Sequence, residues 1–167
     1  EISPKYGAKI LQPAIELLTG IPSVVYGFFG LVVLVPMIRD IGRSLGVGGD
    51  GSSILTASLL LGMMILPTII GLTESSLRAV PSAYYEGGMA LGATHERTIL
   101  RVMIPAAKSG VVAAVVLGIG RAIGETMAVV MIAGNQTIIG DSILSGVRTM
   151  TANIVLEMGY ATGLHRE

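Results

Sequence analysis

Three apolar stretches separated by polar segments restrict what this chain can fold into. Residues 54–77 and 111–134 are long apolar runs on either side of a charged segment, and residues 22–38 form a shorter run. A helix needs about 20 residues to cross the hydrocarbon core of a bilayer, because it rises about 1.5 Å per residue. The sequence therefore predicts an all-α, polytopic membrane helical bundle with candidate spans at 22–38, 54–77 and 111–134.

The composition supports a membrane protein and disfavours other classes. Charged residues make up 13% of the chain and hydrophobic residues 51%, whereas about 25% of the residues in soluble domains are charged. The formal net charge is zero, so there is no electrostatic reason to expect a nucleic-acid partner. The chain has no cysteine, and its two histidines, His95 and His165, form no ligand cluster, so we expect neither a metal nor a cofactor.

The remaining segments are predicted from local patterns. Residues 1–19 place apolar residues at helical spacing and indicate an interfacial helix, interrupted or restarted at Pro13. Residues 39–53 are rich in glycine and serine and predict a loop. Residues 135–167 are expected to form an external segment with a short helix over 151–158. The chain begins without methionine and ends in polar residues, so we expect it to be a piece of a longer chain.

Residues 81–108 form a polar lobe between the second and third candidate spans. Residues 84–91 predict a helix, and Thr94 is the predicted N-cap of a second helix that ends at Pro105. Gly87, Gly88 and Gly92 indicate either that another surface or backbone comes close or that the chain turns at Gly92. Because spans flank the lobe on both sides, it projects from one membrane face, where a helical hairpin is suited to a partner's groove. With the lobe in the cytoplasm, Lys and Arg residues divide six inside to four outside, in the direction of the positive-inside rule.

The spacing of small and aliphatic residues in this lobe resembles the EAA loop of ABC-importer permeases. The matching residues are Glu86, Gly87, Gly88, Gly92, Val102, Ile104 and Pro105. Glycine stands at two positions where the family pattern has alanine, and isoleucine stands where it has the last leucine. The resemblance implies a type I permease fold, and it implies that these residues dock into a cleft of a cytoplasmic ATPase subunit.

Three further stretches, residues 20–31, 120–129 and 148–159, resemble the phosphate-importer permeases. This resemblance implies a partial permease domain over residues 1–167 that crosses the cell (inner or plasma) membrane several times and imports inorganic phosphate. The implied partners are ATP-binding ATPase subunits, a second permease subunit, an extracytoplasmic phosphate-binding protein and membrane lipid. ATPase activity is expected in a partner, because the glycines at 46–51 lack the lysine of a phosphate-binding loop.

Arg121 and Glu125 in the third candidate span mark a candidate substrate pathway. They are four residues apart and would share one face of a continuous helix. Ionisable groups at membrane depth usually face a bundle interior or a wet cavity, and a guanidinium suits phosphate oxygens. We expect Arg121 to contact phosphate and Glu125 to hold Arg121; the alternative is an ion pair that only stabilises helix packing. Glu74, near the end of the second span, is a further candidate for the pathway; the alternative is that its carboxylate is only solvated at the end of the span.

Other functions remain open from the sequence. A permease for another oxyanion or small solute, or a passive channel or sensory membrane module, is an alternative interpretation. A membrane-embedded enzyme is disfavoured because no nucleophile–base pair or metal-ligand cluster can be recognised.

Overall fold

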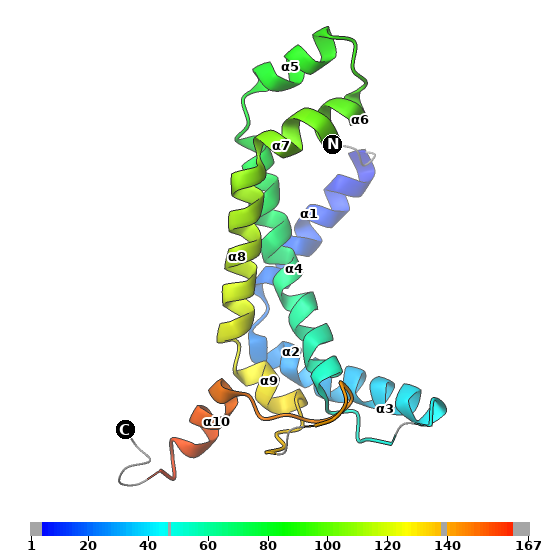
Figure 1. The fold of residues 1–167 in the computed structure, drawn as a ribbon, viewed down its shortest axis with the longest axis vertical. Coiled ribbons are helices and arrows are strands. Elements are labelled where there is room, and N and C mark those ends of the chain that lie inside the picture. The colour runs from blue at the N-terminus through cyan, green and yellow to red at the C-terminus, as the bar shows by residue number, and fades with distance from the viewer. Residues whose placement is uncertain (1–4, 47, 138–139, 162–167) are drawn as a thin grey trace. The chain divides into compact units, whose positions relative to one another are not determined.

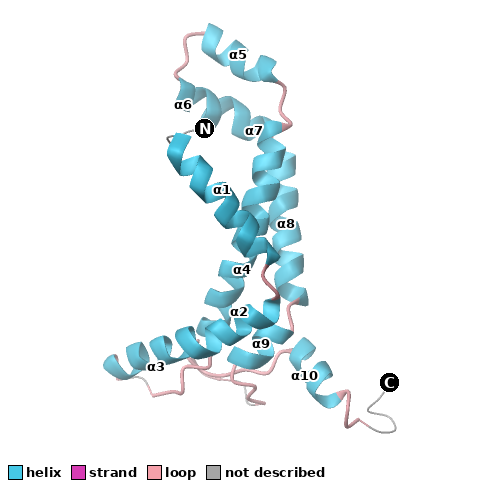
Figure 2. Cartoon of the chain, turned by 180° about the vertical axis from the view of Figure 1, so that it is seen from behind, coloured by secondary structure: helices cyan, strands magenta, loops and turns pink. Residues whose placement is uncertain are grey.

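The computed structural model describes residues 5–46, 48–137 and 140–161, which form helices and loops without a β-strand (Figures 1 and 2). The elements in order are α1 (Lys5–Gly20), α2 (Ser23–Phe29), η1 (Gly30–Leu34), α3 (Val35–Ser44), α4 (Ile54–Arg78), α5 (Ser82–Ala90), α6 (His95–Thr98), η2 (Ile99–Met103), α7 (Ile104–Ala106), α8 (Lys108–Gly124), α9 (Met127–Ile132) and α10 (Met150–Glu157). The predicted all-α class is confirmed. Parts of the predicted interfacial and external segments (1–4, 138–139 and 162–167, with His165) lie outside the described residues.

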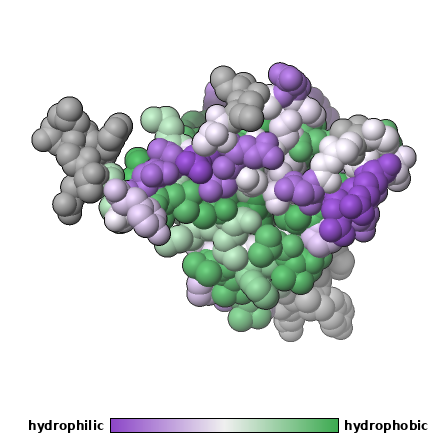
Figure 3. Space-filling model, turned by 90° about the horizontal axis from the view of Figure 1, so that it is seen from below, coloured by the Kyte–Doolittle hydropathy of each residue, from purple (hydrophilic) through white to green (hydrophobic). Residues whose placement is uncertain are grey.

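Long apolar helices dominate the described chain. The continuous helical stretch Ser23–Ser44 and α4 are each long and apolar enough to cross a membrane. His95–Ala106 and Lys108–Gly124 pass the same test only as a pair, with a bend of 69° between them. Many apolar side chains are exposed, including Phe28 and Val116. On the face drawn in Figure 3, a hydrophobic area lies directly beside hydrophilic bands. This surface fits a protein that is surrounded in part by lipid.

The chain divides into two compact units, which we describe separately. The first unit comprises residues 1–20 and 65–121, and the second comprises residues 21–64 and 122–167. The first unit therefore contains α1, the later half of α4, and the elements from α5 to most of α8. The second contains α2, η1, α3, the early half of α4, α9 and α10.

Small residues bring α4 and α8 together in the first unit, where the two helices lie side by side (Figures 1 and 2). A Cβ atom added at Gly118 would lie 2.6 Å from Ile69 Cγ1, and one added at Gly110 would overlap the Ser76 side chain. Glycine is common where membrane helices approach closely, because it lets the two backbones come near each other. These two glycines therefore fix the register between α4 and α8.

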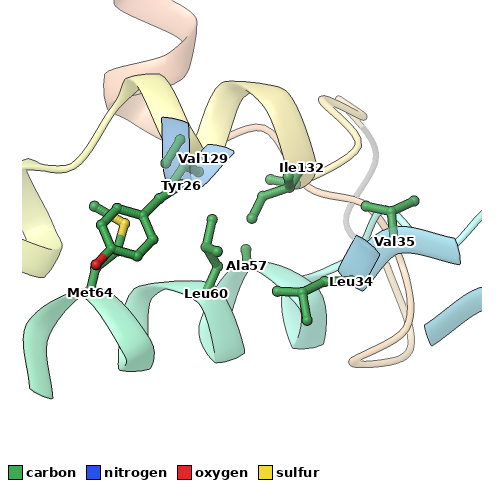
Figure 4. Packing of buried hydrophobic residues seen from close by; sticks show 10 residues of the cluster. Tyr26, Leu34, Val35, Ala57, Leu60, Met64, Val129 and Ile132 are labelled. Atoms are coloured by element: carbon green, nitrogen blue, oxygen red, sulfur yellow. The ribbon is translucent and has the colours of Figure 1, made fainter. Parts of the chain in front are cut away.

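The hydrophobic core of the second unit lies where α2, η1, α4 and α9 meet. Leu60 of α4 and Ile132 of α9 are fully buried and point toward each other (Figure 4). The buried cluster consists of Tyr26, Leu34, Val35, Ala57, Leu60, Met64, Ala128, Val129, Ile132 and Ala133. A Cβ atom at Gly27 would lie 2.9 Å from Ala128 Cα, so glycine is needed for α2 to reach α9.

The N-terminus of α4 is capped by a buried hydroxyl and by a neighbouring loop. Ser53 Oγ accepts a hydrogen bond from the Thr56 backbone N–H at 3.3 Å, and both residues are fully buried. The backbone N–H groups of Ile54 and Leu55 donate to the carbonyl oxygens of Ser145 and Ile143. These bonds satisfy N–H groups that the first turn of a helix leaves without intrahelical partners. They also fasten the loop around residues 143–145 to α4.

The structure differs from the sequence-based expectation at three places. The helix continues through residues 39–44, where a loop was expected, because Val35, Ile38 and Gly42 are buried along one side of α3. The predicted interruption of the first helix is not found, since α1 runs through Pro13. The run 111–134 is divided, because α8 ends at Gly124 and α9 begins at Met127.

Candidate functional site

The polar lobe folds as a helical hairpin at the end of the α4–α8 pair (Figures 1 and 2). Its first helix, α5, ends at Ala90, and Gly92 makes the turn with a φ of +80°. Thr94 caps the second helix, because its side chain accepts a hydrogen bond from the Arg97 backbone N–H at 3.4 Å. The predicted helix, turn and N-cap of the lobe are thus confirmed.

Gly88 and Thr98 form the contact that closes the hairpin. A Cβ atom added at Gly88 would lie 2.6 Å from Thr98 Cγ2, and both residues are buried. The Thr98 hydroxyl donates to the Met89 sulfur at 3.8 Å. The neighbouring Gly87 is different, since a Cβ atom there would meet nothing within 4 Å. Of these two glycines, only Gly88 is needed for α5 to approach α6.

A second contact between the two helices joins Tyr85 and His95. The Tyr85 hydroxyl lies 2.8 Å from His95 Nδ1 and shares a hydrogen bond with it. The rings meet edge to face, with their centroids 5.7 Å apart. This pair was not predicted from the sequence. Its members stand ten residues apart on different helices, so no local spacing rule connects them.

The predicted docking residues lie on α5, at the turn that follows it and at the base of the hairpin, and Gly88 among them is buried against Thr98. Glu86, Gly87 and Gly92 are exposed on α5 and the turn, and Leu91 beside them is 90% exposed. Val102 is half-buried in η2, whereas Ile104 and Pro105 are exposed in α7, which is followed by α8 after a single residue. The hairpin therefore offers an exposed tip whose base continues directly into a long apolar helix.

The base of the hairpin contains a short π-helical segment, η2. Its widened turn is marked by the Ile104 backbone N–H, which donates to the carbonyl oxygen of Ile99. Single π-helical turns inside α-helices are frequent at functional sites, where they change the direction of the following side chains. Here the segment lies between the capped α6 and the 69° bend that leads into α8.

Arg121 and Glu125 do not share a continuous helix, contrary to the expectation from their spacing. Helix α8 ends at Gly124, and the Glu125 backbone N–H bonds to the carbonyl oxygen of Ala122, three residues back. Glu125 instead accepts a hydrogen bond from the Ala128 backbone N–H at 3.3 Å through Oε1. Within the first unit, Arg121 Nη1 donates a hydrogen bond to Thr68 Oγ1 at 2.8 Å.

Glu74, the third pathway candidate, lies near the end of α4 and forms an exposed ion pair with Arg78 at 2.8 Å. The two residues are one helical turn apart, and such pairs are common on solvated helix surfaces. The structure therefore does not bring Glu74 to Arg121.

The second unit has its own polar cluster around Arg148. Its Nε donates to Asn135 Oδ1 at 2.9 Å, and its Nη1 donates to Asn153 and to Glu157 at 3.2 and 3.3 Å. Arg148 also borders an open cleft of about 610 Å³. The bonds tie α10 to the loop before it. Within the described residues, no group of three or more His, Cys, Asp or Glu side chains could hold a metal ion.

Comparison with known proteins identifies the family. Residues 3–164 match the family described as the binding-protein-dependent transport system inner membrane component. The chain belongs to this family. Its fold is accordingly that of a multi-pass inner-membrane permease of the ABC-transporter type, and its apolar helices agree with that location.

Individual relatives of this permease chain are known from several bacteria. A Bacillus subtilis protein named as a probable ABC transporter permease protein is 47% identical over 162 residues, which cover 97% of this chain and 51% of the relative. A Xylella fastidiosa protein named as a phosphate transport system permease protein is 34% identical over 186 residues, covering 99% and 56%. A Mycobacterium tuberculosis protein named as a phosphate transport system permease protein is 36% identical over 176 residues, covering 95% and 52%. The chain spans about half the length of these relatives. No solved structure matches it.

Proposed function

We propose that the chain is part of the permease subunit of an ATP-driven importer for inorganic phosphate. The hairpin of α5 and α6 carries the proposal, because it is an exposed, internally braced element that continues into a long apolar helix. The choice of phosphate is supported by the names of the Xylella and Mycobacterium relatives. The name of the Bacillus relative gives no substrate, so import of another oxyanion is the alternative that the transport experiment must test.

In the proposed mechanism, the hairpin is the part that ATPase subunits hold. Leu91 and Gly92 stand exposed at its tip and Glu86 is exposed on α5, and these residues would enter a groove on the ATPase. The contact between Gly88 and Thr98 keeps α5 and α6 together, so that a force on the tip reaches the base of the hairpin. From there the force passes to α8, and α8 is packed against α4. ATP hydrolysis takes place in the partner, and this chain converts the resulting movement into opening of the pathway.

The other proposed partners follow from the same family membership. A second permease subunit would complete the pathway, and an extracytoplasmic phosphate-binding protein would deliver the substrate. The hairpin then lies on the cytoplasmic side, residues 135–167 on the external side, and α1 at the membrane interface. Arg121 would contact the substrate through its guanidinium. Glu125 and Glu74 are further proposed residues of the pathway.

A co-purification experiment tests the docking step. The full-length permease is expressed with its ATPase subunits, either as wild type or with Gly92→Val. Valine is strongly disfavoured at a φ of +80°, so this variant should distort the tip and release the ATPase. Gly71→Ala is the matched control, because a Cβ atom there meets nothing within 4 Å. Equal recovery of the ATPase with the Gly92→Val variant and the wild type would contradict docking through the hairpin.

A transport experiment tests the substrate. The complete importer is reconstituted in vesicles with its binding protein, and ATP-dependent uptake of phosphate, sulfate and molybdate is compared. Phosphate uptake that the other two anions do not inhibit is the expected result. Preferred uptake of sulfate or molybdate would replace phosphate with another oxyanion and leave the permease assignment intact.

A further inference from the structure

Arg121 differs from the other hydrogen-bonded arginine side chains of the described residues. Arg39, Arg78 and Arg148 each form an ion pair with a carboxylate. The side-chain partner of Arg121 is instead the neutral hydroxyl of Thr68, at 2.8 Å across a sequence separation of 53 residues. This bond therefore depends on the packing of α8 against α4 and not on local spacing.

The position of Thr68 places the bond at membrane depth. Thr68 lies in the middle third of α4, a helix long and apolar enough to cross a membrane. A charged group at that depth is costly unless it has hydrogen-bond partners or reaches water. A hydroxyl replaces part of the lost hydration, yet it carries no charge of its own. The guanidinium has five N–H donors, and Thr68 accepts a hydrogen bond from one of them.

Thr68 is also unusual among the hydroxyl residues in the later half of α4. Ser75 and Ser76 donate to the carbonyl oxygens of Gly71 and Leu72, four residues earlier in the same helix. This is the usual arrangement for hydroxyl side chains in helices. Thr68 accepts from the facing helix instead. Its hydroxyl therefore orients a cation, whereas the two serine hydroxyls only complement their own backbone.

We propose that Thr68 is a positioning residue for oxyanion transfer. Its hydroxyl fixes the guanidinium of Arg121 and leaves both the positive charge and the remaining donors available to a passing phosphate. A carboxylate in this place would cancel the charge and repel the anion. A neutral partner keeps the attraction. The inference rests on the proposed phosphate transport and adds to it a residue outside the motifs that carry the family resemblance.

The test uses the full-length permease assembled with its second permease, ATPase and binding protein in vesicles. Thr68→Val keeps the shape of the side chain and removes the hydroxyl, whereas Thr68→Ser keeps the hydroxyl. We expect Thr68→Val to lower the maximal phosphate uptake rate roughly tenfold, the effect of losing a hydrogen bond to a charged group. Thr68→Ser should retain most of the wild-type rate. Thr73→Val, on the same helix, is the control for loss of a hydroxyl and should leave uptake unchanged.

Combination with Arg121→Gln separates positioning from simple packing. If Thr68 acts through Arg121, Thr68→Val should have no further effect on uptake in the Arg121→Gln background. If Thr68→Val lowers phosphate uptake in the Arg121→Gln background by the same factor as in the wild type, Thr68 acts through helix packing. That result would overturn the inference, whether or not assembly of the complex is also reduced. Wild-type uptake by Thr68→Val beside slow uptake by Arg121→Gln would overturn it as well, while leaving the proposed function in place. Failure of the wild-type importer to transport phosphate would instead refute the proposed function.

Discussion

Replacing Gly88 by alanine should loosen the hairpin, whereas the same change at Gly87 should tighten it. The new Cβ at residue 88 would lie 2.6 Å from Thr98 Cγ2, and ordinary carbon contacts are about 3.5–4.0 Å. The two groups must therefore separate by about 1 Å. Overpacking of this kind typically costs about 1–3 kcal/mol. At Gly87 the Cβ meets nothing, so only the gain in helix propensity of about 1 kcal/mol remains.

The propensity gain is common to both substitutions, so the difference between the two variants isolates the steric cost. That difference of about 1–3 kcal/mol corresponds to amide hydrogen exchange in α5 that is roughly 5- to 150-fold faster in the Gly88→Ala variant than in the Gly87→Ala variant. Exchange would be measured by mass spectrometry on the full-length permease in detergent. Thr98→Ala removes the atoms nearest to residue 88 and should restore most of the protection. Equal exchange in the two single variants, or no rescue by Thr98→Ala, would refute the packing argument.

Three further substitutions test other contacts of the structure. Tyr85→Phe removes the hydroxyl that bonds His95 and should destabilise the hairpin by about 1 kcal/mol; unchanged exchange in α5 and α6 would contradict this. Ser53→Ala removes a buried N-cap and should lower thermal stability by about 1–2 kcal/mol, so an unchanged melting temperature would count against the cap. Arg148→Met removes three side-chain bonds, two of which reach α10, and should speed exchange in α10 while exchange in α5 stays constant.

Hydropathy and local signals account for much of the fold. The run 54–77 corresponds to α4 within one residue, because a long and mainly apolar segment has few alternatives to a helix. The lobe was equally accessible to prediction. Gly92 adopts a backbone conformation that favours glycine, and Thr94 caps its own helix through a bond to a residue three positions away. Both features are encoded within a few residues.

The end of α8 was missed because the hydropathy of an apolar run is the same whether the run forms one helix or two. A local signal was present: Gly124 suits the end of a helix, and Thr126 precedes the apolar residues of α9. The spacing of Arg121 and Glu125 then suggested a pair on one helical face that the interrupted helix does not provide. The actual partner, Thr68, depends on the register between two packed helices, and no local pattern fixes that register.

Because the space around Gly87 is open, a probe attached at this position can report on subunit assembly. The 167 residues include no cysteine, so a cysteine introduced at residue 87 would be their sole thiol, and its side chain would project into empty space. A thiol-reactive fluorophore attached there would change its emission when another protein covers it. The rate and nucleotide dependence of assembly could then be followed in real time on the very helix that is proposed to be captured.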